Sequence, residues 1–449
     1  MPMLAPHAAD RATAEVPTAK EIRLTIDADL QKNLEELARE RLRTLVQMLG
    51  PDVSLAILVA DNATGEVLAH VGSPMYFDER RAGQVDMAQA LRSPGSTLKP
   101  FIYGLGFEDG FIHPETLIDD RPERYGGYAP RNFNYSFAGT VTVRQALQQS
   151  LNMPAIAVLN RVGASRLTAR LAQAGATMVL PDGEAPGLAI GLGGVGTKLS
   201  DLVMLYSGIA QLGTVVPLRE RLDAPVPQAR QLMSSVGAWY VSNVLLGSPP
   251  PENGTPGRIA FKTGTSYGYR DAWSVGFDGK HTLGVWVGRP DGAPVPGLVG
   301  REAAAPILFD AFARLGAPPA ALPRAPAGVL VTSSVKLPPP LRRFQAAPGA
   351  NAQASLHILF PPDGAKLDLS TTDGKPDPIA LKISGAVAPI TLLVNGVPVQ
   401  SEQRGTLFFV PEGPGFARVT VIDSTGSTDS VLVRLDDGTS TRLSLRMAQ

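Results

Sequence analysis

The sequence contains no cysteine, which excludes disulfide bridges, thiolate zinc sites and cysteine nucleophiles. No apolar stretch approaches the roughly 18 residues that cross a bilayer, and no N-terminal signal pattern is present. Histidine is also scarce, so a multi-histidine metal centre is not expected, and we expect neither a metal nor a cofactor. The five histidines are His7, His70, His113, His281 and His357.

An excess of charge of either sign is absent as well. The chain has 41 Lys plus Arg against 41 Asp plus Glu. A protein that holds nucleic acid or an anionic membrane surface needs a clustered basic excess, so no nucleic-acid partner is expected. The length of 449 residues is typical of two or three domains, and 46 Gly with 40 Pro indicate abundant loops and turns.

The N-terminal part begins with an Ala- and Pro-rich stretch and continues with regular patterns. Residues 1–20 show no periodicity and are interpreted as a linker. Residues 21–26 are typical of a short strand, and Asp27 can cap a helix in which leucines recur at helical spacing. Two β-rich runs, 53–60 and 66–71, are separated by Asn-Ala-Thr-Gly, which predicts a hairpin.

The middle of the chain, from about 96 to 310, mixes helical patterns with strand patterns. This order favours an α+β arrangement over regular βαβ repeats. Helices are predicted at 142–151 and 200–212, and strands at 259–262, 272–277 and 281–287.

The pattern changes after residue 315. Residues 318–348 carry eight prolines and are interpreted as an interdomain connector or an irregular strap. From 355 onward, short strand-like runs alternate with turn residues, and no long helical pattern intervenes. This is typical of a small β-sandwich.

The first candidate catalytic motif is Ser96-Thr97-Leu98-Lys99. A serine and a lysine three residues apart share one helix face, so the amine can reach the hydroxyl. The preceding Pro94-Gly95 places Ser96 near a helix N-terminus, where backbone N–H groups favour developing negative charge. Lysine can act as a base only if burial or neighbouring cations lower its pKa. The same spacing in Ser333-Ser334-Val335-Lys336 is assigned to chance.

The second motif is Ser150-Leu151-Asn152, which follows a helical pattern and precedes Met153-Pro154. A loop there can project a hydroxyl that relays a proton and an amide that holds a substrate carbonyl. The alternative is an ordinary helix C-cap followed by a proline stop.

The third motif is Lys262-Thr263-Gly264-Thr265, at the end of a strand-like run. Gly264 would allow a ligand to approach the strand, while Lys262, Thr263 and Thr265 could bind a carboxylate. A strand N–H could complete an oxyanion hole with that of Ser96. The alternative is a solvated strand end.

The three motifs occur in the order found in class A β-lactamases and penicillin-binding proteins, with Ser-Leu-Asn in place of Ser-Asp-Asn. A competing signal is Gly191-Leu192-Gly193-Gly194-Val195-Gly196, which satisfies the dinucleotide-binding pattern G-x-G-x-x-G. Because Pro and Gly break the segment before it and no βαβ unit follows, we expect a glycine-rich bend beside the active-site cleft.

On these motifs, residues 21–315 resemble the transpeptidase domain of class A penicillin-binding proteins, most closely the penicillin-binding protein 1C group. The resemblance implies a serine β-lactamase-like α+β domain, an antiparallel sheet flanked by helices. Residues 316–354 would then be a Pro-rich connector, and residues 355–449 resemble the β-rich C-terminal domain of that group. The resemblance is carried by residues 92–103, 128–133, 148–155 and 262–273.

The resemblance also implies a reaction. Ser96 would attack the D-Ala-D-Ala amide of a peptidoglycan stem peptide, with Lys99 as the base, and an amine of a neighbouring stem peptide would take the acyl group. β-Lactams would acylate the same serine. The other implied roles are a proton relay for Ser150 with Lys262, a substrate clamp for Asn152, and carboxylate binding along Thr263, Gly264 and Thr265.

Bifunctional members of this family carry a glycosyltransferase domain and a membrane anchor before this region, and neither is visible. We therefore expect either a fragment of a longer protein or the product of a split gene, in a periplasmic setting. Two alternatives stay open. A serine hydrolase, either a carboxypeptidase or a β-lactamase, would need a base for water, for which Glu184 is the nearest acidic candidate. A docking or sensor protein would bind an envelope partner through residues 355–449.

Overall fold

The computed structural model describes residues 4–125, 128–130, 132, 136–180, 185–345, 356–372, 375–384, 386, 388–399, 407–411, 413–424 and 428–437. It divides into two compact units, Met1–Phe344 and Gln345–Gln449. Among the described residues, no helix combines the length and the apolar character that a bilayer span requires.

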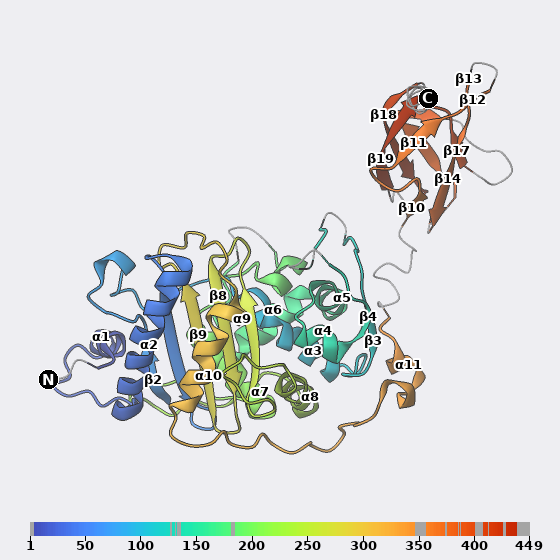
Figure 1. Ribbon diagram of the computed structural model, residues 1–449. Coiled ribbons are helices and arrows are strands. Elements are labelled where there is room, and N and C mark those ends of the chain that lie inside the picture. Colours follow the sequence, from blue (N-terminus) through green and yellow to red (C-terminus); the bar gives the residue numbers. More distant parts are fainter. Residues whose placement is uncertain are drawn as a thin grey trace. The chain divides into compact units, whose positions relative to one another are not determined.

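The first unit is built on a five-stranded antiparallel sheet (Figure 1). The predicted hairpin and the three predicted strands are therefore confirmed, and they pair with one another. The strand order is β2 (Val67–Val71), β1 (Ser54–Asp61), β9 (His281–Gly288), β8 (Asp271–Phe277) and β7 (Ala260–Thr265). β7 therefore forms one edge of the sheet.

Helices cover both faces of this sheet. Leu55 and Ile57 of β1 pack into a core with α2 (Ala28–Leu49) and α10 (Ala305–Ala313). Ala56 and Leu58 face a larger core on the other side. Because β1 is buried on both faces, its sequence reads as one continuous apolar run. Asp27 caps α2 by accepting a hydrogen bond from the Leu30 N–H at 2.9 Å, as predicted.

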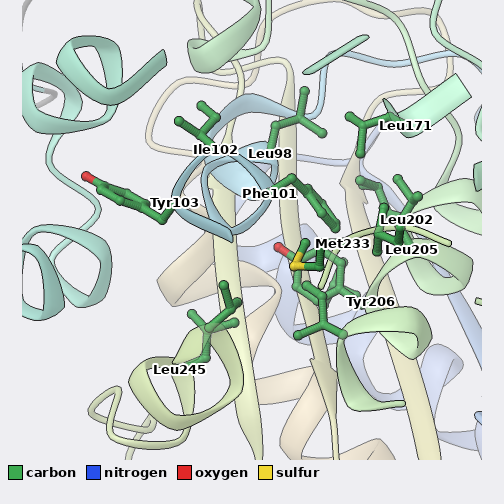
Figure 2. Packing of buried hydrophobic residues seen from close by; sticks show 14 of the residues in the cluster. Leu98, Phe101, Ile102, Tyr103, Leu171, Leu202, Leu205, Tyr206, Met233 and Leu245 are labelled. Atoms are coloured by element: carbon green, nitrogen blue, oxygen red, sulfur yellow. The ribbon is translucent and has the colours of Figure 1, made fainter. Parts of the chain in front are cut away.

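The larger core surrounds α3 (Lys99–Glu108), the helix that follows the first motif (Figure 2). Phe101 packs edge-on against Tyr206 of α7 (Leu199–Ala210), with 5.4 Å between ring centroids. The predicted helices at 142–151 and 200–212 are confirmed as α4 (Val143–Gln148) and α7. The other helices of this region are α5 (Asn152–Val162), α6 (Ala164–Ala174), α8 (Ser235–Leu246) and α9 (Gly300–Ala303).

Short elements complete the first unit. Two hairpins lie outside the main sheet: β3 (Leu117–Asp120) with β4 (Gly139–Thr142), and β5 (Thr214–Val215) with β6 (Arg230–Gln231). Short helical turns occur at η1 (Glu79–Arg81), η2 (Gly95–Leu98), η3 (Leu188–Leu192), η4 (Ser334–Lys336) and α11 (Pro339–Arg342).

The linker predicted at residues 1–20 is wrong for residues 6–15. Pro6–Glu15 form helix α1, and Ala5, Ala8 and Ala12 are buried at helical spacing. Pro6 occupies the first turn of the helix, where its missing N–H costs least. The strand predicted at 21–26 is reduced to one isolated bridge between Leu24 and Arg221.

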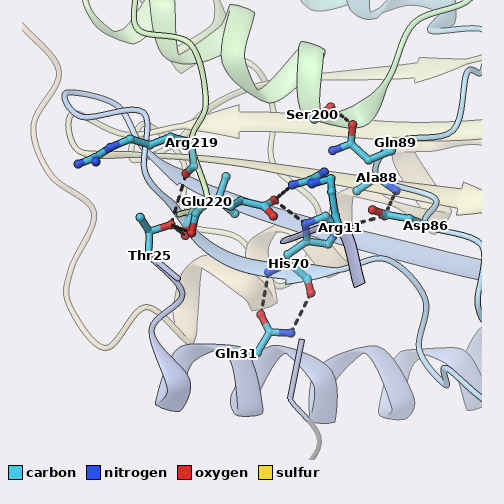
Figure 3. A network of polar contacts seen from close by, with 11 residues as sticks. Arg11, Thr25, Gln31, His70, Asp86, Ala88, Gln89, Ser200, Arg219 and Glu220 are labelled. Atoms are coloured by element: carbon cyan, nitrogen blue, oxygen red, sulfur yellow. Dashed lines mark hydrogen bonds and ion pairs between the residues drawn. The ribbon is translucent and has the colours of Figure 1, made fainter. Parts of the chain in front are cut away.

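A buried polar cluster links α1 to the edge of the sheet (Figure 3). His70 of β2 lies 2.8 Å from a Glu220 oxygen and 2.9 Å from an Asp86 oxygen, and Arg11 of α1 pairs with Glu220. Burial alone would lower the pKa of His70, but its hydrogen bonds to the two carboxylates outweigh burial and raise the pKa to about 9. A charged imidazolium at neutral pH therefore stabilises this corner.

Residues 316–344 form a strap on the first unit, so the connector predicted at 316–354 is wrong for these 29 residues, which lie in Met1–Phe344. The Ala320 carbonyl accepts a hydrogen bond from Gly279 at 3.0 Å. The Leu330 N–H donates to the Tyr240 hydroxyl at 2.7 Å, and the Phe344 N–H donates to Leu117 of β3 at 2.8 Å. The alternative of an irregular strap is thus confirmed.

In the described part of the second unit, a three-stranded and a five-stranded sheet share one core, as predicted for a small β-sandwich. Val419 and Val433 of one sheet and Phe409 of the other are buried in this core. One sheet has the order β10 (His357–Phe360), β14 (Ile379–Ser384), β17 (Leu407–Phe409). The other has β11 (Lys366–Leu369), β19 (Thr428–Asp437), β18 (Gly415–Ile422), β15 (Thr391–Val394) and β16 (Val397–Val399), and β12 (Thr371–Thr372) pairs with β13 (Lys375–Pro376).

The attachment of the strap can be tested at Tyr240. In Tyr240→Phe the Leu330 N–H loses its acceptor, and the hydroxyl no longer donates to the Leu330 carbonyl at 3.0 Å. We expect amide hydrogen exchange at Leu330 to speed up by about 5- to 150-fold, since such a loss costs about 1–3 kcal/mol. The matched control is Tyr267→Phe, because the Tyr267 side chain is 97% exposed. Unchanged exchange at Leu330 in Tyr240→Phe would contradict the assigned attachment.

Candidate active site

Ser96 lies in the short helical turn η2, directly before α3, and this turn packs against β7. Two glycines allow the close approach. A Cβ on Gly95 would lie 2.4 Å from the Thr265 carbonyl oxygen, and a Cβ on Gly264 would lie 2.6 Å from the Pro94 carbonyl oxygen. Gly95 also has a φ of +53°, which favours glycine. Gly264 was predicted to make room for a ligand. In the structure, the space left by its missing side chain is occupied by the turn that carries Ser96.

Hydrogen bonds hold both ends of this turn. The Trp273 indole N–H donates to the Ser93 carbonyl at 2.8 Å, and the buried Tyr206 hydroxyl donates to the Thr97 carbonyl at 2.7 Å. Ser96 is partly exposed, and within the described part of the chain its hydroxyl makes no hydrogen bond. The serine is thus fixed by its backbone while its side chain stays available.

Ser150 occupies the junction between α4 and α5. Its φ of +60° is unusual for a residue other than glycine. The Ser150 N–H donates to Leu147 at 3.1 Å and the Leu151 N–H donates to Ala146 at 2.9 Å, so the junction closes α4 as a helix C-cap does. The two interpretations of this motif are therefore compatible, because the cap conformation is also what orients the Ser150 side chain.

Two lysine amines meet at Ser150. The Lys262 amine donates to the Ser150 hydroxyl at 2.8 Å and to the Thr263 carbonyl at 2.7 Å. The Lys99 amine donates to the Ser150 carbonyl at 2.5 Å and to the Asn152 side-chain oxygen at 2.6 Å, with a longer contact of 3.4 Å to the Ser150 hydroxyl. The direct hydrogen bond predicted between Lys99 and Ser96 is not among these contacts.

Burial changes the charge state of both amines. Burial lowers the pKa of Lys99 well below its usual value, the nearby charge of Lys262 lowers it further, and Asp120 opposes the change. Burial lowers the pKa of Lys262 to about 7. The lowered pKa that a lysine base requires is therefore present at Lys99.

Hydrogen bonds hold the end of β7 in place and leave the proton of the Thr265 hydroxyl available. The Thr265 hydroxyl accepts a hydrogen bond from the Gly300 N–H at 3.0 Å, so its proton remains for a ligand. Beyond the strand, the Ser266 hydroxyl donates to the buried carboxylate of Asp271 at 2.9 Å and accepts from the Asp271 N–H at 2.8 Å. The predicted binding strand thus ends in a fixed turn.

Two residues of the site were not predicted to act there. The Asn132 amide donates to both oxygens of Asp120, at 2.8 and 2.9 Å, and its own oxygen accepts from the Asn152 N–H at 2.8 Å. In the sequence Asn132 stood out only as part of the family-like stretch 128–133. Nothing in the sequence singled out Asp120, because its partners come from two other segments.

The other sequence candidates that the structure describes contribute no side chain to the hydrogen bonds around Ser150. The glycine-rich bend at 191–196 packs beside η2, as expected, and the Ser93 hydroxyl donates to the Gly193 carbonyl at 2.7 Å. Ser333 and Lys336, the second Ser-x-x-Lys pair, are exposed on the strap. Glu184 lies outside the described residues. Within the described ranges, no group of three or more His, Asp or Glu side chains could hold a metal ion.

Comparison with protein families gives two matches. Residues 55–288 match the penicillin binding protein transpeptidase domain, and residues 346–435 match the Penicillin-Binding Protein C-terminus Family. The second match begins just after the boundary between the two units at Phe344.

Two curated relatives match most of the chain. Penicillin-binding protein 1C of Escherichia coli (strain K12) is 43% identical over 312 residues, which are 69% of this chain and 40% of that protein. Penicillin-binding protein 1B of Vibrio cholerae serotype O1 is 27% identical over 300 residues, which are 60% of this chain and 37% of that protein. The chain thus spans about two fifths of the length of these relatives.

Solved structures show the same fold. The PonA1 protein from Mycobacterium tuberculosis in complex with penicillin V has a TM-score of 0.62 at 20% identity, covering 75% of this chain and all of that one. Penicillin-binding protein 1A from Haemophilus influenzae has a TM-score of 0.60 at 15% identity, covering 85% of this chain and 75% of that one. Since the transpeptidase match spans more than half of the 449 residues, the chain belongs to the penicillin-binding protein transpeptidase domain family.

Proposed function

We propose that the first unit is a serine-type DD-transpeptidase of peptidoglycan synthesis. It forms an acyl-enzyme at Ser96 with the penultimate D-alanine of a stem peptide and passes the acyl group to an amine of a neighbouring stem peptide. The observation that carries this proposal is the meeting of two buried lysine amines at Ser150 beside the turn that bears Ser96. A periplasmic setting goes with this substrate.

In the acylation step, Lys99 takes the proton of the Ser96 hydroxyl. A neutral amine has two N–H bonds and one lone pair, and the two short hydrogen bonds of Lys99 go to Ser150 and Asn152. The lone pair is then left to accept a proton. The Ser96 oxygen forms a bond to the peptide carbonyl carbon, and the carbonyl oxygen takes the negative charge, which backbone N–H groups of Ser96 and Thr265 stabilise.

The carbon–nitrogen bond then breaks, and the leaving amine of the terminal D-alanine takes the proton of the Ser150 hydroxyl, which the Lys262 ammonium replaces. General acid catalysis of this kind contributes about 10²–10⁴-fold. The carboxylate of the same D-alanine binds along β7 through the hydroxyls of Thr263 and Thr265 and the charge of Lys262. An acceptor amine then attacks the ester carbon and gives its proton back through Ser150 to Lys262, the bond from the carbon to the Ser96 oxygen breaks, and that oxygen recovers the proton held by Lys99. A β-lactam acylates Ser96 by the same first step, but its leaving nitrogen stays covalently attached to the acyl group through the opened ring.

The two alternatives make different demands. Hydrolysis of the acyl-enzyme needs a base that activates water, and the candidate Glu184 lies outside the described residues. A docking role for the second unit, which matches the C-terminus family, stays a prediction, together with its envelope partner.

The nucleophile can be tested with a fluorescent penicillin. Ser96→Ala removes the attacking oxygen, so we expect covalent labelling to be lost, while wild type carries the label on the peptide that contains Ser96. The matched control is Ser333→Ala, which removes the serine of the second Ser-x-x-Lys pair and should leave labelling unchanged. A label that persists on another residue in Ser96→Ala would exclude the proposal, and rapid turnover of a chromogenic cephalosporin would favour the hydrolase.

The charge of the two amines predicts a bell-shaped pH dependence of the acylation rate. Since the pKa of Lys99 is lowered, the neutral base is present above that pKa, and the rate falls as the pH drops through it. Above the pKa of Lys262, about 7, its charge is lost, and the rate falls again.

The variant Lys262→Arg tests the alkaline limb, because a guanidinium stays charged throughout this range. We expect its alkaline limb to move up by more than one pH unit, even where the maximal rate is lower. Lys198→Arg, which makes the same exchange outside the site, should keep the wild-type profile. An alkaline limb that stays near pH 7 in Lys262→Arg would show that another group titrates there.

A further inference from the structure

Asp120 is a buried carboxylate that the reaction described above does not use. It is the last residue of β3, its side chain is fully buried, and no ion pair of the described residues includes it. Instead, it accepts hydrogen bonds from the Asn132 amide at 2.8 and 2.9 Å and from the Ala138 N–H at 2.7 Å. Burying a carboxylate without an ion-pair partner is costly unless hydrogen bonds replace its lost solvation.

The contacts of Asp120 fix the orientation of Asn132. A carboxylate can only accept hydrogen bonds, so the NH₂ group of the Asn132 amide must face it. The same NH₂ group also donates to the Ser136 carbonyl at 2.8 Å. The oxygen of Asn132 therefore points the other way, where it accepts a hydrogen bond from the Asn152 N–H at 2.8 Å.

Asn152 passes this constraint on to the amine of Lys99. Asn152 is the first residue of α5, where backbone N–H groups have no partner within the helix, so Asn132 satisfies one of them. The side-chain oxygen of Asn152 lies 2.6 Å from the Lys99 amine. Three hydrogen-bonded steps thus connect Asp120 to Lys99. On the basis of the function proposed above, we propose that Asp120 is a positioning residue that holds the Lys99 amine for its reaction with Ser96.

The strand that carries Asp120 is itself held in place. β3 pairs with β4 from Leu117 to Asp120, and its first residue accepts a hydrogen bond from the Phe344 N–H at the end of the strap. Asp120 therefore approaches Lys99 from a fixed element. The charged or titratable groups that face Lys99 are Lys262 from β7 and Asp120 from β3, and Tyr103 of α3 is also near Asp120. Tyr103 stays neutral, because burial and the charge of Asp120 raise its pKa.

The variant Asp120→Asn separates positioning from mere structural support. The variant replaces a group that only accepts hydrogen bonds by an amide, whose NH₂ group would repel the NH₂ group of Asn132 and disturb its orientation. We therefore expect acylation of Ser96 by penicillin to slow by about 10- to 100-fold at the pH optimum. The negative charge near Lys99 is also lost. Because that charge favours the ammonium form, its removal should move the acid limb of the pH profile to lower pH.

The matched control is Asp119→Asn. It removes the neighbouring carboxylate of the same strand, which contacts Thr140 and Arg343 and has no such path to Lys99. This variant should keep both the rate and the acid limb of wild type. If the acid limb moved to lower pH in both variants, the effect of Asp120 would be explained by the loss of a nearby negative charge alone, and the proposal would be overturned.

A second variant covers the case in which Asp120→Asn does not fold, as judged by its thermal unfolding midpoint. Asn132→Ala breaks the path but keeps the charge of Asp120, so we expect a similar loss of rate without a downward shift of the acid limb. Wild-type acylation by Asn132→Ala, or by folded Asp120→Asn, would refute the positioning role. If Ser96 of the wild-type protein takes no label, the proposed function fails instead, so the two failures can be told apart.

Discussion

The burial of two lysine amines around one serine is the constraint on which the site depends. Lys99 and Lys262 come from a helix and a sheet edge and share contacts with Ser150, which a third segment contributes. Such burial costs stability. Below pH 7 Lys262 is protonated in both the folded and the unfolded chain, so the full cost is present, and it diminishes as the pH rises from about 7 toward the usual 10.5, because only the unfolded chain then still binds the proton.

The fold offsets this cost by close packing on either side of the site. β7 is the edge strand of the five-stranded sheet. Because Gly95 and Gly264 have no side chains, the turn that carries Ser96 can lie directly against this strand. Trp273 and Tyr206 then tie the ends of the turn to the sheet and to α7. The serine is thus positioned by backbone contacts, and its hydroxyl needs no partner in the described part of the chain.

Much of this arrangement could be predicted from the sequence, and the exceptions have physical causes. The motif residues and the strands of the sheet carry local signals, in residue type and in period. Helix α1 was missed because the buried face of its first two turns consists of small alanines and a histidine, which give a weak hydrophobic signal. The strap was ambiguous because its hydrogen bonds are scattered along it and many go to side chains of distant segments, such as Tyr240, so they leave no periodic pattern in the sequence. Asp120 could not be found because its role depends on Asn132 and Asn152, which only the fold brings to it.

The charge of the two amines tests the account most directly. The ¹³C NMR signals of lysine Cε carbons can be followed with pH in the full chain and assigned with Lys99→Arg and Lys262→Arg. The account predicts that the Lys262 signal titrates near pH 7 and that the Lys99 signal titrates well below the usual lysine range. If both signals titrate near pH 10, as those of exposed lysines do, then Lys99 is charged at neutral pH and cannot be the base.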